Sequence, residues 1–292
     1  MATLAALRDN VRRLLEDSPS RDQLDEALDA TETTVTVDTG SKFSANTRLE
    51  VDSEVMLVTA VSGNDLTVVR GHGGTTAATH ADDAEVRINP RFLTANLNEA
   101  INVVLTSWCT NYFPRLVWDT TTAGTFLSNT WIYEAPSDAL TVEKVVWNVP
   151  GYTAQKPVST TGLNTYDTDT VASGLGFEVY DMGLPGHTVR VLYGKIWPEL
   201  TTDASETVSD FPSNAIDLIT NGAMIYLSGM REVPKWRVDE VVSHQERNQV
   251  SPPSFSNRWL QIKRQEWRNR ALDISKNRPQ SGKPRKVYRG LN

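Results

Sequence analysis

The residues with the clearest potential for chemistry are the histidines His72 and His80, which flank a Gly-Gly-Thr-Thr segment and precede Asp82 and Asp83. Imidazole nitrogens and carboxylate oxygens together could bind a metal ion. However, the spacing of the two histidines matches no recurring zinc pattern, and the chain has no His-Glu-x-x-His motif. We therefore expect no metal site, and we expect both histidines to lie in an exposed loop at the tip of a β module.

Other candidates for catalysis or cofactor binding also fail on their surroundings. Residues 71–75 are glycine-rich but lack the lysine of a phosphate-binding loop, and Pro284 removes a backbone N–H from the segment around Lys283. The single cysteine, Cys109, excludes an intrachain disulfide and follows Trp108 in an apolar stretch, which predicts a small buried side chain rather than a nucleophile. With no carboxylate pair in a recognisable motif, we expect no cofactor and no enzymatic activity.

Seven of the eight tryptophans fall into two groups. One group lies in apolar or strand-like segments and is expected in a core or on a sheet face: Trp108, Trp118, Trp131 and Trp147. The other group lies on basic, polar helical segments with little else to bury it, and we assign it to a subunit interface: Trp236, Trp259 and Trp267.

The elements that position these residues alternate between helical and strand periodicity. Leu4, Leu7, Val11, Leu14 and Leu15 mark an amphipathic helix, and Ser20 with Gln23 fits a capping box for a second helix through Leu28. The fold class is α+β, a discontinuous helical core carrying two β inserts and a basic C-terminal tail. The expected segments are core helices in 1–30, a small β module in 31–89, a core helix in 90–114, a second β region in 115–211, core helices in 212–275 and an extended basic tail in 276–292.

Several local signals define these segments. Alternating strands in 31–89 predict a small barrel or sandwich, with a hairpin turn at residues 62–65. Asn89-Pro90 is typical of a helix start, and the polar residues 159–173 predict an exposed, mobile loop. Residues 216–227 are apolar on all sides, so that helix must be buried by its own chain or by a neighbouring subunit.

Charge is distributed unevenly along the 292 residues, of which 39% are hydrophobic, enough to form a core. Residues 231–292 contain 15 Lys and Arg against 6 Asp and Glu, a net of +9, whereas residues 1–230 contain 14 against 30, a net of −16. The overall charge of −7 argues against a dedicated reader of duplex DNA. The sequence shows no signal-peptide pattern or membrane-spanning stretch, which predicts synthesis in the cytoplasm and no membrane partner.

One stretch of the sequence resembles a β module that recurs in virion proteins of tailed bacteriophages. It comprises residues 54–71, Glu-Val-Met-Leu-Val-Thr-Ala-Val-Ser-Gly-Asn-Asp-Leu-Thr-Val-Val-Arg-Gly, followed by residues 74–80, Gly-Thr-Thr-Ala-Ala-Thr-His. The order of elements along the chain is similar to that of the head-to-tail adaptors, or connector proteins, of siphophages. The motif covers roughly residues 31–89, and the layout covers the whole chain.

This resemblance implies a structural protein of the virion neck, made in the host cytoplasm, that forms a twelve-fold ring beneath the portal protein. Such a ring extends the DNA channel without sequence-specific binding and presents a platform for the next tail-side connector, a stopper or tail completion protein. The basic tail is then expected to dock on the portal or a neighbouring subunit through Lys283, Arg285, Lys286, Val287, Tyr288, Arg289 and Leu291. The alternatives are a tail-tip or fibre-associated binding protein that uses its β modules and, more weakly, a hydrolase with unrecognised carboxylates.

Overall fold

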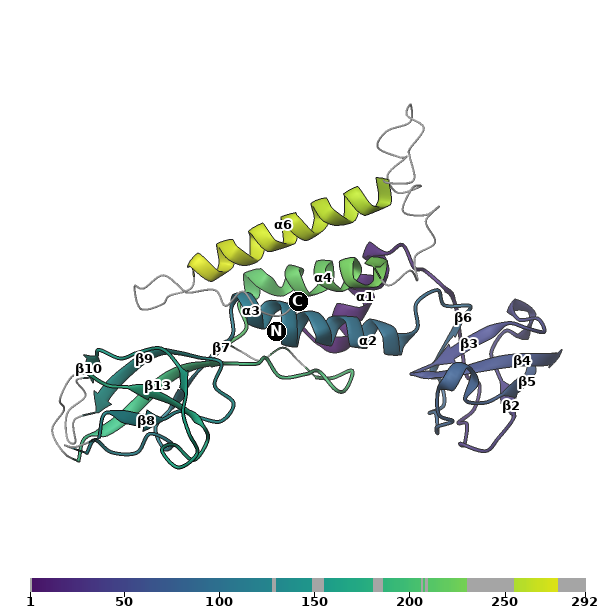
Figure 1. Cartoon of the computed structure of the whole chain (residues 1–292). Helices are drawn as coiled ribbons and strands as arrows, with labels where there is room; N and C mark the ends of the chain where they lie inside the picture. The colour runs from purple at the N-terminus through teal and green to yellow at the C-terminus, as the bar shows by residue number, and fades with distance from the viewer. Residues whose placement is uncertain are drawn as a thin grey trace. The chain divides into compact units, whose positions relative to one another are not determined.

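The chain has an α+β fold with antiparallel sheets, shown in Figure 1. The computed structural model describes residues 2–127, 130–148, 155–180, 186–205, 207, 210–229 and 255–277. The chain forms two compact units. The first comprises residues 1–104, 200–207 and 216–267, and the second comprises residues 105–199, 208–215 and 268–292. The described helices are α1 (Leu4–Leu14), α2 (Thr94–Val103), α3 (Thr110–Tyr112), α4 (Ile216–Gly229) and α6 (Phe255–Asn277).

Helices α1, α2 and α4 of the first unit contact one another although they are far apart in sequence (Figure 1). Helix α1 begins where the side chain of Thr3 accepts a hydrogen bond from the backbone N–H of Ala6. Its buried residues include Leu4, Leu7 and Val11, as the helical period predicts. Leu14, expected on the same face, is 43% exposed because the helix ends there.

Helix α2 forms part of the core, but it does not begin at Asn89-Pro90 as the sequence suggests. Asn89 instead lies just after a strand that ends at Ile88, with a φ of 48°, and exchanges hydrogen bonds with the backbone of Arg48 at 2.6 and 2.9 Å; the helix begins only at Thr94. Beyond Val103 a π-helical turn, Val104–Cys109, continues into α3. Leu97, Ile101, Val104 and Leu105 of this segment are buried, whereas Leu93 and Trp108 are half-buried.

The sequence left open whether helix α4 is buried by its own chain or by a neighbouring subunit, and the structure shows it buried within its own unit. Leu218, Ile219, Ala223, Ile225 and Leu227 are all within the core. Gly222 permits the close approach of its neighbours, since a Cβ atom there would lie 2.6 Å from a methyl carbon of Val104 and 3.0 Å from the indole nitrogen of Trp267.

The small β module is one curled six-stranded sheet with the order β1-β6-β3-β4-β5-β2, and among the described residues no barrel closes. Its edge strands β1 and β2 come together at the isolated bridge between Leu24 and Val37. Residues 62–65 form the predicted hairpin turn, with Gly63 at a φ of 65°. The strands are β1 (Ser20–Gln23), β2 (Thr34–Thr36), β3 (Arg48–Val51), β4 (Glu54–Ser62), β5 (Asp65–Val69) and β6 (Glu85–Ile88).

The sequence predicts a short helix in residues 20–28, and this prediction is wrong. Ser20–Gln23 is strand β1 and pairs antiparallel with β6, so the small β module begins at Ser20 rather than at residue 31. Leu24 and Leu28 are four residues apart, as on a helix face, but each forms a β-bridge, with Val37 and His80 respectively. Pairing with distant strands overrides the local helical pattern here.

The first unit contains a buried ionic network between α1, the module and α2. Arg12 on α1 donates to Asp17 at 2.8 Å, to Glu50 of β3 at 3.3 Å and to the hydroxyl of Thr94 at 3.2 Å. Glu50 is completely buried and accepts a 2.6 Å hydrogen bond from the backbone N–H of Thr94. Burial raises the pKa of Glu50, against the opposing effects of the Thr94 N–H and Arg12. The network therefore connects the module to the helices through oppositely charged buried side chains, each of which would be unfavourable without its partner.

The second unit contains a four-stranded sheet, β10-β9-β13-β7, and a three-stranded sheet, β11-β12-β8. Their side chains form one core, in which Phe126 and Trp147 make an edge-to-face contact and Tyr133 stacks near Phe177. Part of the loop expected at residues 159–173 is strand β11, which pairs with β12. The strands are β7 (Arg115–Asp119), β8 (Ile132–Glu134), β9 (Thr141–Asn148), β10 (Gln155–Val158), β11 (Asn164–Thr165), β12 (Leu175–Glu178) and β13 (Thr188–Lys195).

Candidate functional site

The densest group of polar side chains surrounds Glu54, at the start of β4 in the small β module. Its carboxylate, 1% exposed, accepts hydrogen bonds from Arg70 Nε and Nη2 at 2.7 and 2.9 Å. The backbone N–H groups of Gly71 and Ala78 donate to it at 3.0 and 2.9 Å, and His80 Nε2 lies 2.9 Å away. Burial opposes ionisation, yet these hydrogen bonds prevail and lower the pKa of Glu54 to about 2.

Arg70 extends this cluster to the surrounding loops. Its Nη1 atom donates to the carbonyl oxygens of Asp29 and Glu32, at 2.6 and 2.7 Å, and its Nη2 atom donates to that of Ala78 at 2.6 Å. Together with the two hydrogen bonds to Glu54, these contacts give the guanidinium of Arg70 five hydrogen bonds. The loop after β5 is thereby closed onto the sheet.

His80 lies between two carboxylates. Its Nδ1 atom is 2.7 Å from Asp52 and its Nε2 atom is 2.9 Å from Glu54, and its side chain is 1% exposed. Because ionised carboxylates only accept hydrogen bonds, both contacts form together only when each ring nitrogen carries a hydrogen. The expectation that His80 is exposed is therefore wrong, whereas His72 is half-buried and uses its carbonyl to bind Thr75.

The Glu54 cluster is suited to holding a loop, and its geometry does not suit acid–base catalysis. The carboxylate oxygens of Glu54 are occupied by donors, and the low pKa makes it a poor base. Gly71 has a φ of 61° and donates its N–H to Glu54, so this glycine shapes the loop without presenting its N–H to a phosphate. Within the described part of the chain, no group of three or more His, Cys, Asp or Glu could hold a metal ion.

Sequence reasoning missed the Glu54 cluster because its other side chains, Arg70 and His80, are 16 and 26 residues from Glu54. A signal was present, since Glu54 begins a strand that continues with apolar residues, and a charged side chain buried there requires a partner. Cys109 agrees with the prediction: it is fully buried, and desolvation raises the pKa of its thiol.

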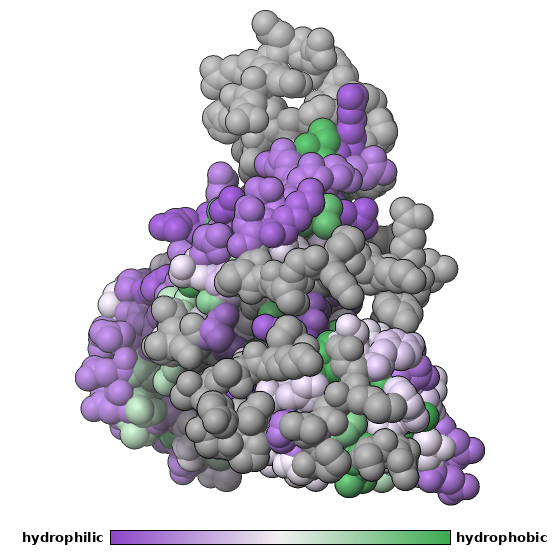
Figure 2. All heavy atoms as spheres, turned by 90° about the vertical axis from the view of Figure 1, so that its left-hand side faces the viewer, coloured by the Kyte–Doolittle hydropathy of each residue, from purple (hydrophilic) through white to green (hydrophobic). Residues whose placement is uncertain are grey.

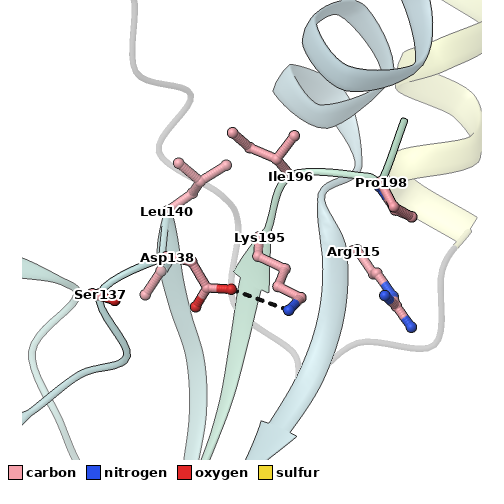
Figure 3. A pocket seen from close by; sticks show the side chains of 8 residues that line it. Arg115, Ser137, Asp138, Leu140, Lys195, Ile196 and Pro198 are labelled. Carbon is pink, nitrogen blue, oxygen red and sulfur yellow. Dashed lines mark hydrogen bonds and ion pairs between the residues drawn. The ribbon is translucent and has the colours of Figure 1, made fainter. Parts of the chain in front are cut away.

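A pocket of about 340 Å³ lies in the second unit at the ends of β7 and β13 (Figure 3). Arg115 and Lys195 are opposite each other in the sheet, and each is balanced by a carboxylate: Asp210 at 3.0 Å and Asp138 at 3.1 Å. Burial and the negative charge of Asp138 raise the pKa of the nearby Tyr193 to about 12. The complete lining is Arg115, Ser137, Asp138, Ala139, Leu140, Lys195, Ile196 and Pro198.

The pocket offers charge pairs and an apolar rim rather than reactive groups. Leu140 and Ile196 are 44% and 52% exposed, and Lys195 and Asp138 point toward each other in Figure 3. An activated nucleophile needs a hydrogen-bonded base; among the described residues Ser137 forms no hydrogen bond to one, and the carboxylate of the pocket, Asp138, is paired with Lys195. The pocket is thus a small docking surface at most.

The tryptophans assigned to a subunit interface have different environments. Trp267 is 5% exposed and its indole N–H donates to the carbonyl of Leu218 at 2.7 Å, so the premise that it lacks a partner within its own chain is wrong. The indole of Trp267 thus packs on α4 as part of the buried face of its own helix. Trp259 is half-buried, and Trp236 lies outside the described residues.

The other tryptophans divide between core and surface. Trp147 is buried, Trp108 is half-buried, and Trp118 and Trp131 are 38% and 50% exposed. Arg190 lies over the ring of Trp118, 5.0 Å from its centroid. The predicted tail-docking set falls wholly outside the described residues: Lys283, Arg285, Lys286, Val287, Tyr288, Arg289 and Leu291.

Comparison with known proteins adds no family assignment: no protein-family model matches the chain, and no curated protein matches its sequence. Among the described residues, no helix combines the length and apolar character needed to cross a bilayer.

Proposed function

We propose that the chain is a structural head-to-tail adaptor of a phage virion. In this role it forms a ring under the portal, extends the DNA channel and provides the docking platform for tail-side proteins. The supporting observation lies in the motif that resembles a β module of virion proteins: its residues Glu54, Arg70, Gly71 and His80 stabilise a loop of the small β module. A motif whose polar residues are spent on architecture fits a structural protein, so the proposal includes no catalytic step and no cofactor.

The arrangement of helices and strands supports the same proposal. Helices α1, α2 and α4 contact one another across the intervening β segments, as in a discontinuous helical core that carries two β inserts. In such a layout the core provides the ring wall, and the inserts are free to differ between relatives. A portal protein, a stopper or tail completion protein, and further copies of the chain, twelve in all, are the proposed partners.

Locating the chain in virions tests the proposal most directly. Electron microscopy of particles that carry a tagged chain should show the tag at the neck, between head and tail. A tag at the tail tip, or particles without the chain, would refute the adaptor role.

A second experiment tests the proposed docking of the basic tail. Removal of residues 279–292 should leave the melting temperature nearly unchanged and greatly weaken attachment to portal-bearing heads. Two full-length variants separate the contributions: Lys283, Arg285, Lys286 and Arg289 changed to Ser, and Val287, Tyr288 and Leu291 changed to Ser. Attachment of all three proteins at the wild-type level would show that the tail has no docking role.

The alternative function, a tail-tip or fibre-associated binding protein, is favoured by exposed aromatic residues of the second unit. Trp131 and Tyr180 are 50% and 58% exposed, and the backbone N–H of Val179, next to Tyr180, donates to the carbonyl of Trp131. Each of these exposed rings can stack on a sugar or on a partner protein. Binding to purified cell walls that is lost in Trp131→Ala would favour this alternative.

A further inference from the structure

Helix α6 presents a row of exposed side chains spaced four residues apart, which we call the basic row: Arg264, Arg268, Leu272 and Lys276. The opposite face of α6 is buried through Trp267, Ala271 and Ile274. Figure 2 shows α6, in the upper part of the view, as a mostly hydrophilic surface with few apolar side chains. Leu272, 38% exposed, is an apolar member of this outward-facing row.

The two arginines of the basic row have no acidic residue within a helical turn on their side of α6. The described ion pair of α6 joins Lys263 to Glu266, at 2.8 Å, and none of the row's three cations takes part in a described ion pair. Arg264 and Arg268 are four residues apart, and no acidic residue lies three or four positions from either. Like charges at this spacing destabilise a helix, so the row is better accounted for by a partner than by the helix itself.

The small β module carries the complementary charge. Around strand β2 the structure gathers four exposed acids, which we call the acidic patch: Asp25, Glu26, Asp38 and Asp65. The hydroxyl of Thr36 lies 2.9 Å from a carboxylate oxygen of Glu26 and 3.1 Å from one of Asp65, which keeps the two acids close together.

The exposed cations of the module do not neutralise this patch. Arg21 pairs with Glu85, at 3.1 Å, and Lys42 pairs with Asp22, at 2.9 Å. Among the described residues none of the four acids of the patch forms an ion pair. Val69, 49% exposed, shares the outer face of β5 with Asp65 because side chains alternate along a strand, so the patch has an apolar neighbour.

We infer that the basic row of one copy docks on the acidic patch of a second copy of the same chain. Every copy carries both surfaces, and the two surfaces are different, so the contact is head-to-tail; its repetition gives a ring when the rotation between successive copies closes and an open filament when it does not. The cations meet Glu26 and Asp65, and Leu272 gains an apolar contact at Val69. This contact specifies how copies adjoin in the proposed ring, and in that respect it rests on the proposed function.

A charge exchange in the full-length protein tests the contact without phage particles. Self-association of wild type, measured by sedimentation velocity, should be weaker at about 0.5 M than at about 0.05 M salt because the contact is screened. The row variant, Arg264→Glu with Arg268→Glu, and the patch variant, Glu26→Lys with Asp65→Lys, should each associate at least about tenfold more weakly. An equimolar mixture should recover association, since the acidic row then meets the basic patch and the basic row meets the acidic patch.

The control carries the same charge change as the patch variant at exposed sites outside the module: Asp169→Lys with Glu199→Lys. This control should associate as wild type does, and all variants should keep the wild-type melting temperature. If a reversal disturbs folding, the milder Arg264→Gln with Arg268→Gln and Glu26→Gln with Asp65→Asn replace it.

Three results would overturn the inference: a wild-type protein that stays monomeric at both salt concentrations, a mixture that fails to recover association, or a control that loses association equally. The outcome is separable from the adaptor role, because this assay contains no portal. Copies could associate through these surfaces in a protein that is absent from the neck, and an adaptor found at the neck could lack this contact.

Discussion

Replacing Arg12 with Met tests whether the buried network holds the small β module to the helices. Arg12 is 2% exposed and contacts Asp17, Glu50 and Thr94. Methionine fills part of the same volume but removes the charge and every donor. Glu50 then keeps the Thr94 N–H and the more distant Arg87, at 3.9 Å.

The size of the effect follows from the burial of the partners. The side chains of Asp17 and Glu50 are 4% and 0% exposed, so removing their cation leaves carboxylates that water cannot solvate. Breaking a buried ion pair from one side costs about 3–5 kcal/mol. We expect Arg12→Met to lower the free energy of unfolding by about this amount at neutral pH.

The loss should depend on pH in a defined direction. Burial already raises the pKa of Glu50 above its unfolded value of 4.5, which means that ionised Glu50 disfavours the folded state. Without Arg12 the pKa of Glu50 rises further. The penalty is therefore greatest above the folded-state pKa, shrinks as the pH falls through that pKa, and is smallest below 4.5, where Glu50 becomes protonated in both states.

Urea denaturation at several pH values, followed by circular dichroism and tryptophan fluorescence, provides the measurement. Residues 20–89 contain no tryptophan, so fluorescence reports on the remainder of the chain while circular dichroism reports on all of it. Arg13→Met, an exposed neighbour on α1, is the matched control and should change stability by less than about 0.5 kcal/mol. A loss below about 1 kcal/mol for Arg12→Met, independent of pH, would refute the reasoning.

Three further outcomes are expected for the loop and the helical packing. His80→Ala should lower the free energy of unfolding, measured by chemical denaturation, by about 1–3 kcal/mol because it removes a partner of the buried Glu54. The control His72→Ala should change it by less than about 0.5 kcal/mol. Equal effects of the two substitutions would contradict the role of the Glu54 cluster. Because the pKa of Glu54 is lowered to about 2, its stabilising contribution is present above about pH 4.5 and is lost as the pH falls towards 2, and an acid titration of Glu54→Gln should lack this loss. Gly222→Ala should lower the free energy of unfolding by about 1–3 kcal/mol because the new Cβ would lie 2.6 Å from a side-chain carbon of Val104. Gly162→Ala, which has open space around its Cβ position, should change it little. Comparison of the two melting curves tests this difference.

The sequence predicted the elements whose pattern is local and unopposed. The strands β3 to β6, their hairpin turn and the buried face of α1 follow from alternation, turn residues and helical spacing. The apolar composition of α4 predicted burial in the same way. In these segments propensity and tertiary packing favour the same structure, so a short window of sequence is sufficient.

Errors arose where a distant strand competes for a segment. Ser20–Gln23 has a plausible helix cap, but its backbone pairs with β6 more than 60 residues away. Asn89 has the sequence signature of a helix start, but it follows the end of β6 and is hydrogen-bonded to the backbone of Arg48, and the helix begins only at Thr94. A local cap contributes about 1 kcal/mol, and several ladder hydrogen bonds with a buried face exceed it.

The candidate site and the proposed contact surfaces depend on tertiary structure to different degrees. Composition alone showed that the C-terminal part is basic and the remainder acidic. Only the fold revealed that Glu54, Arg70 and His80 share one buried cluster and that Trp267 is covered by its own chain. The physical reason is that charge and periodicity are properties of the chain itself, whereas burial and hydrogen-bond partners exist only after distant segments have come together.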